Sequence, residues 1–422
     1  MMRKIKIAFI CYYSNEELRR ILHQRIPWWE KYGRKLMHIS PPKLSDHGVW
    51  NENAIKEFEA YEDIEVSVIL PQKFISKKEV QFELRGIHYY VFRDEDSYFS
   101  SRVKRMFCRR KKKEYHQNRE IIKSLLKEVT PDIVHVVGAE NAFYSLSLLD
   151  VPSSVPTIIQ LQTLINDPGF FQNYFMSADS YKYATEIERR ILQKSTYIAT
   201  RARKYINVIK ESIKSDATFL DFSLALNEPV NIEKRQTTYT FVYFAKIIAK
   251  AVDYAIESFA IAHKKHPEIT LDVIGSCPPD LMKSLKNRIH ELGIQDFVIF
   301  EGELPTHADV IKQIRKSRFA LLPVKISLTT GTIREAMANG LPVVTSDTGE
   351  LGTQQLNKDK ECVLLSAKGD HEAMAENMMK LLESPETERK LIQNASERAA
   401  NLRTNAQVVS EWVETYRTII KN

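Results

Sequence analysis

The sequence predicts an α/β protein of two domains, each built on a parallel β-sheet that helices cover on both faces. Short apolar runs rich in Val, Ile and Phe alternate with amphipathic helical segments along most of the chain, which is typical of such sheets. The length of 422 residues also exceeds the usual size of one domain. The polar segment 227–238 interrupts the alternation, which then starts again.

The first half of the chain carries strands and helices in the order that a parallel sheet requires. Each expected strand is a short β-branched or aromatic run, and each expected helix repeats apolar residues every three or four positions. The expected strands are 4–11, 64–70, 87–92, 133–137, 157–161 and 196–200, and the expected helices are 120–129 and 183–193.

The second half alternates more regularly, and glycines end two of its strands. The expected strands are 239–244, 269–274, 297–300, 319–323 and 342–345, and the expected helices are 252–263, 279–292, 308–317 and 333–339. We therefore expect a first domain at 1–228 and a second at 229–403. The later helical run breaks near 401–405 and resumes, so we expect residues 404–422 to form a helix that returns to the first domain.

Composition and cysteine usage favour a soluble protein of the reducing cytoplasm. The chain is 43% hydrophobic and 27% charged, which is ordinary for a globular protein. Its four cysteines are far apart and show neither zinc-ligand spacing nor a disulfide framework. No segment approaches the ~20 apolar residues of a membrane span, and the first residues lack the cleavage site of a signal peptide.

The segment 327–349 is the most informative part of the sequence. A hydroxyl-rich loop leads into an expected helix, whose free N–H groups and positive dipole end suit a diphosphate. Glu335 lies in the first turn of that helix, and its position alone leaves two interpretations open. With Thr332 it forms the T-x-x-E pattern of a capping box, or it faces a ligand.

The run EAMANGLPVV at 335–344 resembles the EAMAxGxPVV segment of glycosyltransferase family 4, whose members are retaining nucleotide-sugar transferases. Four more blocks resemble that family in the family's order, and five ordered blocks are more specific than one motif. They are FVYFAKIIAK at 241–250, LDVIGS at 271–276, QDFVIFEGEL at 295–304 and ALLP at 320–323. The resemblance implies the GT-B fold, with two Rossmann-like domains whose parallel sheets face each other across an inter-domain cleft. It also implies that the donor binds the second domain and the acceptor the first.

The resemblance also implies roles for residues at matching positions. Glu335 matches the glutamate that binds the donor ribose, and Lys246 and Lys250 match the basic pair that holds the diphosphate. We expect these three residues to act in catalysis, because two ammonium groups offset the charge of the leaving group. The other expected donor-site residues are Gly275, Ser327, Thr329, Thr330, Gly331 and Thr332.

Several positions depart from the family pattern. Ser327 stands where the family has another glutamate near the donor sugar, and Gln162 stands where a histidine follows a strand. In the first domain, DIVHVVG at 132–138 resembles the family's DVVHxHG strand. The expected acceptor-side residues are Tyr12, Ser14, Gln162 and His135, although a packed position in a strand is an open alternative for His135.

These assignments predict a retaining hexosyltransferase that needs no metal and no cofactor. It would move a sugar from a nucleoside-diphosphate sugar to a glycan, plausibly lipid-linked, for a cell-surface polysaccharide. The lysines would take the role that a metal plays elsewhere, since no acidic pair lies beside the donor loop. Two alternatives stay open: a non-catalytic nucleotide-sugar-binding partner of another transferase, which Ser327 and Gln162 favour, and a nucleotide-sugar epimerase on the same fold.

The net charge of +7 is concentrated in one basic segment. Residues 102–113 contain eight Lys or Arg and no acidic residue. A solvated surface is one interpretation, and nucleic acid is disfavoured because no binding motif accompanies the charges. For an enzyme with a lipid-linked acceptor we favour peripheral contact with the anionic inner face of the cell membrane. The residues expected to make it are Arg109, Arg110, Lys111, Lys112 and Lys113.

Overall fold

The structure is a computed structural model that divides into two compact units. It describes residues 3–36, 42–98, 114–170, 177–225, 228–245, 247, 249–325, 331–350 and 352–421. The first unit consists of Met1–Phe171, Met176–Leu226 and Thr404–Asn422, and the second of Gln172–Phe175 and Asn227–Arg403. The basic segment 102–113 lies outside the described residues, so its expected contact with a membrane stays a prediction.

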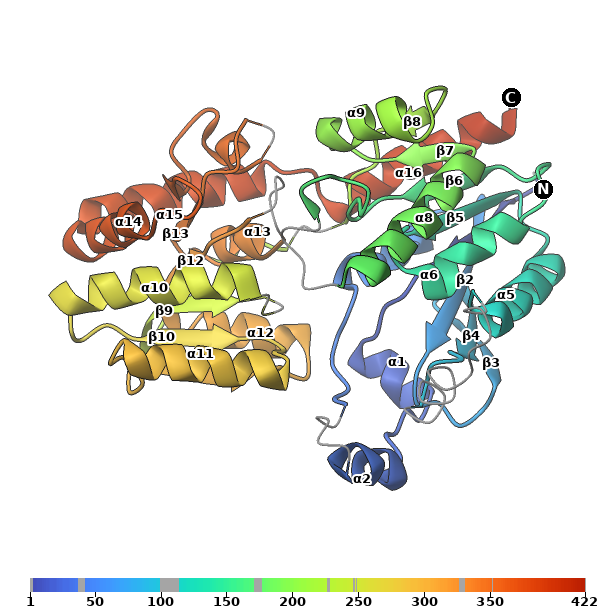
Figure 1. The fold of residues 1–422 in the computed structure, drawn as a ribbon. Coiled ribbons are helices and arrows are strands. Elements are labelled where there is room, and N and C mark those ends of the chain that lie inside the picture. The colour runs from blue at the N-terminus through green and yellow to red at the C-terminus, as the bar shows by residue number, and fades with distance from the viewer. Residues whose placement is uncertain are drawn as a thin grey trace. The chain divides into compact units, whose positions relative to one another are not determined.

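An eight-stranded sheet forms the centre of the first unit, in the order β3-β4-β2-β1-β5-β6-β7-β8 (Figure 1). Its strands are β1 (Ile5–Ile10), β2 (Ile64–Gln72), β3 (Glu79–Leu84), β4 (Ile87–Arg93), β5 (Ile133–Val137), β6 (Thr157–Gln160), β7 (Tyr197–Ala199) and β8 (Thr218–Leu220). All neighbouring pairs are parallel except β3 and β4.

One edge of this sheet departs from the parallel arrangement of its other strands. Only Arg85 and Gly86 separate β3 from β4, with φ angles of 51° and 74°. Two residues with positive φ form the kind of tight turn that joins antiparallel strands in a hairpin. A parallel connection would need a much longer crossover.

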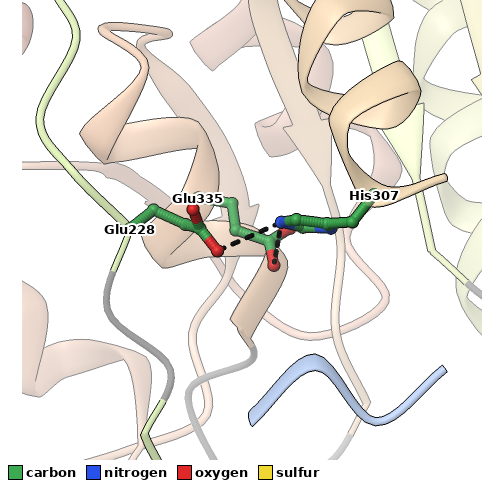
Figure 2. A group of neighbouring side chains, drawn as sticks. All are labelled: Glu228, His307 and Glu335. Carbon is green, nitrogen blue, oxygen red and sulfur yellow. Dashed lines mark hydrogen bonds and ion pairs between the residues drawn. The ribbon is translucent and has the colours of Figure 1, made fainter. Parts of the chain in front are cut away.

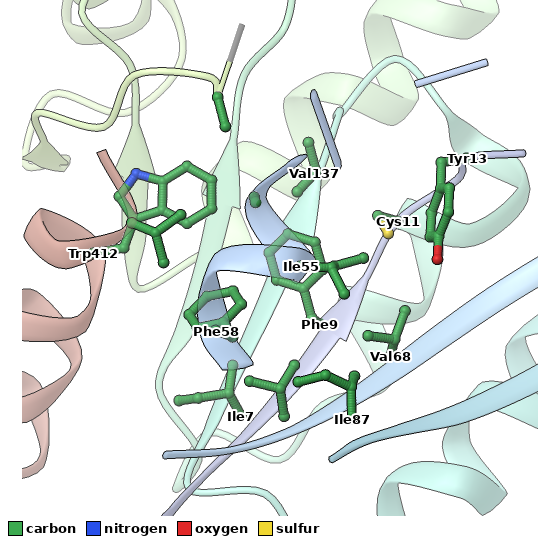
Figure 3. Packing of buried hydrophobic residues seen from close by; sticks show 14 of the residues in the cluster. Ile7, Phe9, Cys11, Tyr13, Ile55, Phe58, Val68, Ile87, Val137 and Trp412 are labelled. Carbon is green, nitrogen blue, oxygen red and sulfur yellow. The ribbon is translucent and has the colours of Figure 1, made fainter. Parts of the chain in front are cut away.

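The helices of the first unit include the last helix of the chain. They are α1 (Glu16–Ile21), α2 (Trp28–Leu36), α3 (Val49–Glu57), α5 (His116–Val129), α6 (Ala142–Ser145), α8 (Ala178–Lys194), α9 (Arg203–Ser212) and α16 (Asn405–Lys421). Trp412 of α16 is 1% exposed and its ring packs against Phe9, Phe58 and Phe222 (Figure 3). The chain thus returns to complete the core of its first unit.

The second unit contains a six-stranded parallel sheet in the order β11-β10-β9-β12-β13-β14. Counted from β9, this is the order 3-2-1-4-5-6 of a Rossmann sheet. The strands are β9 (Tyr239–Phe244), β10 (Leu271–Ile274), β11 (Val298–Gly302), β12 (Ser317–Leu322), β13 (Val343–Ser346) and β14 (Leu364–Ser366). The helices are α10 (Ala249–Lys265), α11 (Pro279–Glu291), α12 (His307–Ile314), α13 (Gly331–Ala338), α14 (His371–Glu383) and α15 (Pro385–Ala400).

Cys11, Cys277 and Cys362 are free thiols, and Cys108 lies outside the described residues. Among the helices that the structure describes, none has the length and apolar character needed to cross a bilayer.

Candidate functional site

The strand order of the second unit reverses between β9 and β12. From β9 the sheet continues to β10 and β11 on one side, and to β12, β13 and β14 on the other. In an open parallel sheet, the connections that follow two such strands diverge and leave a crevice where ligands bind. The chain leads from β9 into α10 and from β12 into α13, so both helices begin at this edge (Figure 1).

The expected donor-site residues lie along these two connections. Lys250 is in the first turn of α10, although its side chain is outside the described part, while Gly331 begins α13 and Thr332 follows it. Helix N-termini carry free N–H groups and the positive end of the dipole, so this edge is suited to an anion. The remaining expected residues, Lys246, Ser327, Thr329 and Thr330, lie outside the described residues.

Gly275 shapes the same edge through its lack of a side chain. Its φ is 143°, and a Cβ atom built there would lie 1.9 Å from the carbonyl oxygen of Ala245. The Ile247 amide donates to the Ser276 carbonyl at 3.1 Å, so the connection after β9 runs directly against the end of β10. Gly275 therefore positions backbone, and no ligand contact needs to be assumed for it.

Glu335 shares a cluster with two residues that the sequence analysis missed, Glu228 and His307 (Figure 2). The Nε2 atom of His307 lies 3.1 Å from Oε1 of Glu228 and 4.0 Å from Oε1 of Glu335. The three side chains are between 17% and 23% exposed, so they are largely but not fully withdrawn from water. A hollow of about 530 Å³ opens beside them and is lined by Glu228, His307, Ala308, Ile311, Lys312 and Arg315.

Burial raises the pKa of Glu335 to about 7, with the Glu228 charge acting in the same direction and His307 opposing it. Near neutral pH this carboxyl is therefore present in both its charged and its neutral form. A ligand whose hydroxyl groups donate to the carboxylate would stabilise the charged form. Binding of a polyol such as ribose would therefore shift Glu335 toward its charged form.

The same three residues offer a donor set that could hold a divalent metal ion. One nitrogen and two carboxylate oxygens lie within 4.8 Å of one another. Imidazole and carboxylate ligands suit several divalent metals. Independence from metal therefore stays a prediction for this chain.

The capping-box interpretation of Glu335 is wrong. Helix α13 begins at Gly331, so Thr332 lies within the helix. The Ser or Thr of a capping box instead precedes the first helical residue. The functional interpretation of Glu335 no longer competes with this structural one.

A capping box does occur in the neighbouring helix, where it positions His307. The Thr306 hydroxyl accepts from the Asp309 amide at 3.0 Å, and the Asp309 carboxylate accepts from the Thr306 amide at 3.2 Å. His307 follows β11 at the carboxyl edge of the sheet, so attention to strand ends could have found it. Glu228 could not have been found in this way, because it belongs to the polar segment before β9.

The strand order of the first unit reverses between β1 and β5. Tyr12 follows β1 and Gln162 follows β6, and both side chains are partly exposed. The Tyr12 ring packs against His47 and, edge-on, against Phe143. Tyr12 and Gln162 therefore keep their place as acceptor-side candidates.

The other two acceptor-side residues have structural positions. His135 is in the middle of β5 and 0% exposed, and its Nδ1 lies 2.6 Å from the Tyr416 hydroxyl of α16. Burial lowers the pKa of His135 to about 3, so it is neutral and closed to an acceptor. Ser14 is buried and its backbone pairs with His47 in both directions, at 2.9 Å each. The expectation that His135 and Ser14 contact the acceptor is corrected accordingly.

Glu140 is a further polar residue at this edge. Gly138, with φ 92°, leaves room above it for three side chains, since a Cβ would lie 2.5 Å from Asn141 Nδ2, 2.8 Å from Glu140 Oε1 and 3.0 Å from Gln162 Nε2. Asn141 Nδ2 donates to Oε1 at 2.9 Å. The Oε2 atom of Glu140 is buried and has no hydrogen-bond partner in the part of the chain that the structure describes. Burial raises the pKa of this carboxyl to about 8, so at pH 7 it is neutral and can donate as well as accept.

We expect Glu140→Gln to reduce the loss of stability at alkaline pH. The folded-state pKa of about 8 lies above the usual 4.5, so the stability that the bound proton provides is complete below 4.5 and is lost as pH rises through 8. Glutamine has no such proton. Between acidic and alkaline pH, the difference in the free energy of unfolding between wild type and variant should therefore change by roughly a few kcal/mol. Urea unfolding at acidic, neutral and alkaline pH measures it, with the exposed Glu79→Gln as the control. Parallel pH curves for wild type and Glu140→Gln would contradict the prediction.

Comparison with known proteins shows what the second unit resembles. Residues 227–398 match the family model described as "Glycosyl transferases group 1". The matched range includes Glu228, His307 and Glu335. Residues 227–398 are therefore similar to group 1 glycosyltransferase domains.

Similarity to known proteins is not limited to the second unit, and in the solved structures the likeness of fold covers nearly the whole chain. An uncharacterized glycosyltransferase from Haemophilus influenzae is 26% identical over 284 residues, which are 65% of this chain and 73% of that protein. The structure of sucrose-phosphate synthase from Thermosynechococcus elongatus matches with a TM-score of 0.70 and 14% identity, over 99% of this chain and 100% of that one. Anabaena HepE in complex with UDP and glucose matches with a TM-score of 0.63 and 14% identity, over 98% and 100%. These structures confirm the expected fold class, an α/β chain with two Rossmann-like sheets of the GT-B type.

Proposed function

We propose that the protein is a retaining glycosyltransferase that moves a sugar from a nucleoside-diphosphate sugar to a glycan acceptor. The observation that carries this proposal is the placement of Glu335. It lies in the region similar to group 1 domains, in the helix that follows β12, at the edge of the sheet where α10 and α13 begin. A largely buried carboxylate for hydroxyl groups beside two helix N-termini for phosphates is the combination that a nucleoside diphosphate requires.

In the proposed reaction each group of the second unit has a separate task. Glu335 accepts hydrogen bonds from the ribose hydroxyls, while the N-termini of α10 and α13 stabilise the diphosphate together with Lys246 and Lys250. The anomeric carbon exchanges its bond to the diphosphate oxygen for a bond to an acceptor hydroxyl. The positive groups offset the charge that develops on the leaving diphosphate. No protein nucleophile is assigned.

The acceptor side of the proposal rests on the first unit. Tyr12, Gln162 and Glu140 follow its strands at the edge where the strand order reverses, and they offer hydroxyl, amide and carboxyl groups to a sugar. We propose a lipid-linked glycan of a cell-surface polysaccharide as the acceptor. Because the similar Anabaena HepE was solved with UDP, a uridine diphosphate sugar is the first donor to test.

The function is tested by incubating the full chain with a panel of nucleotide sugars, with and without a glycan acceptor, and by measuring the released nucleotide. A transferase releases nucleoside diphosphate in an acceptor-dependent way. An epimerase converts the sugar without acceptor, and a non-catalytic binding partner leaves every donor unchanged. A parallel reaction with a chelator tests the role of metal, since lost turnover that added metal restores would contradict independence from metal.

Membrane attachment through the basic segment is part of this proposal. Replacing Arg109, Arg110, Lys111, Lys112 and Lys113 with glutamine should weaken binding to anionic vesicles, since each basic residue contributes about 1 kcal/mol near such a surface. Nucleotide binding should not change. Vesicle co-sedimentation at low ionic strength measures the effect, because salt screens these charges. Equal co-sedimentation of variant and wild type would contradict it.

A further inference from the structure

Helix α2 buries an ion pair and leaves its large apolar side chains exposed. Glu30 is 1% exposed, and the Arg34 guanidinium donates to its carboxylate at 2.7 Å. The large side chains on the rest of the helix are exposed: Trp28 by 77%, Trp29 by 41%, Tyr32 by 58% and Leu36 by 63%. A surface helix of a globular protein normally has the opposite arrangement, with its apolar stripe against the core.

The exposed apolar residues of the chain are concentrated in this helix. Among the residues that the structure describes, seven large hydrophobic side chains are exposed, and four of them belong to α2. The others are Val230, Ile232 and Ile420, which lie elsewhere in the sequence. Single exposed apolar residues are ordinary, but a cluster of this kind marks a surface that contacts something other than water. In Figure 1 α2 stands apart from the central sheet of its unit.

Charge and residue type indicate that the contacting surface is a lipid bilayer. Lys31 and Lys35 are exposed and lie three and seven residues from Trp28, so they flank the aromatic side of the helix. Lysine can place its methylene groups along apolar material and keep its ammonium group at the headgroups. Tryptophan and tyrosine are suited to the same boundary, because one end of each ring system is apolar and the other polar.

The dimensions of α2 and its neighbours in the chain agree with an interfacial position. Nine residues are too few to span a bilayer, but an amphipathic helix can lie in the plane of its surface. The Trp29 ring contacts the Tyr98 ring, with 5.0 Å between centroids. Tyr98 precedes the basic segment 102–113 by four residues in the sequence, so positive charge follows closely along the chain.

We infer that α2 is an interfacial anchor that inserts Trp28, Trp29, Tyr32 and Leu36 into an anionic bilayer surface. Lys31 and Lys35 contact the headgroups. This inference rests on the membrane part of the proposed function and deepens it by naming the surface. Its test measures no glycosyl transfer, so its failure is distinguishable from failure of the enzymatic proposal.

Co-sedimentation of the full chain with phosphatidylglycerol/phosphatidylcholine vesicles tests the anchor. Trp28→Ser and Tyr32→Ser should each weaken binding about tenfold, since an aromatic side chain that leaves the apolar phase changes affinity by about that factor. Lys31→Gln with Lys35→Gln should weaken binding to these vesicles and hardly affect binding to pure phosphatidylcholine. Ile420→Ser, which removes an exposed apolar side chain from α16, is the matched control and should bind like wild type.

A second measurement on the unmodified chain keeps the test independent of how the variants fold. The chain has four tryptophans, of which Trp412 is buried and Trp50 is half-buried. Brominated lipids in the vesicles should therefore quench emission chiefly from Trp28 and Trp29. The inference would be overturned if the wild-type protein at low salt neither co-sedimented with the vesicles nor showed quenching of its tryptophan emission. Dimers that form without lipid and are lost in Trp28→Ser would also overturn it and assign the helix to a second copy of the chain.

Discussion

Glu335→Gln should lower the affinity for a nucleoside-diphosphate sugar about tenfold to a hundredfold. The carboxylate of Glu335 is proposed to accept charge-assisted hydrogen bonds from the ribose, and such bonds contribute about 1.5–3 kcal/mol. Glutamine keeps the shape but replaces one of the two acceptor oxygens with an NH₂ group, which donates. Calorimetric titration of both proteins with UDP and with a UDP-sugar measures the change.

The unusual pKa of Glu335 gives the same titration a second readout. With a pKa of about 7, the carboxyl of the free protein is partly protonated at neutral pH. Ribose hydroxyls favour the charged form, so binding should release a proton, and the measured enthalpy should depend on the ionisation enthalpy of the buffer. This dependence should disappear in Glu335→Gln. The control is Glu303→Gln in the connection after β11, which should keep both the affinity and the proton release.

Equal affinities in the two proteins would contradict a ribose contact by Glu335. Melting curves without ligand separate this result from a loss of folding. Below the usual carboxyl pKa of 4.5 the neutral carboxyl resembles the amide, so the free energy of unfolding of the variant should be close to that of wild type there. As pH rises from 4.5 through the folded-state pKa of about 7, wild type should become the less stable of the two, because unfolding then releases a proton from this carboxyl.

Gly275→Ala should destabilise the second unit by about 2–5 kcal/mol. A methyl group at this position would lie 1.9 Å from the Ala245 carbonyl oxygen, so backbone must move, and the φ of 143° is unfavourable for alanine in addition. The connection from β9 into α10 would be displaced. Nucleotide binding should therefore fall together with stability.

Gly293→Ala is the matched control for this substitution. Gly293 also has a positive φ, of 71°, but no atom lies within 4 Å of a Cβ built there. Its replacement should cost about 1 kcal/mol and leave nucleotide affinity unchanged. Urea unfolding of the two variants measures the difference in stability. If both lost the same amount, the close approach of Ala245 to Gly275 would have no energetic importance.

Regular elements of the second unit could be predicted well because local pattern and buried environment agree there. The strand expected at 239–244 is β9 with the same limits, and the sequence block around Gly275 follows β10 as expected. The antiparallel strand β3 was missed although Glu79–Leu84 alternates polar and apolar residues, which is the pattern of a strand with one solvated face. The search for buried strands, which are apolar throughout, passed over this strand at the edge of the sheet.

The candidate site could be predicted only in the parts that a continuous motif carries. Glu335 was found from its neighbours in sequence, whereas its contact with His307 joins segments 28 residues apart and has no local signature. Glu228 comes from a third segment, the chain before β9, and contacts His307. For His135 the packed alternative holds rather than the acceptor contact, and the sequence could not decide between them because the core that buries it is completed by α16 at the other end of the chain.

The most direct test of the proposed function is a proton NMR time course of the full chain with an α-linked nucleoside-diphosphate sugar and a glycan acceptor. The anomeric proton of the donor and that of the product are resolved in one experiment. A retaining transferase should consume the donor signal, release nucleoside diphosphate and produce a new α-anomeric signal at the same rate. A β-linked product, or no consumption of any donor in the panel by folded protein, would contradict the account.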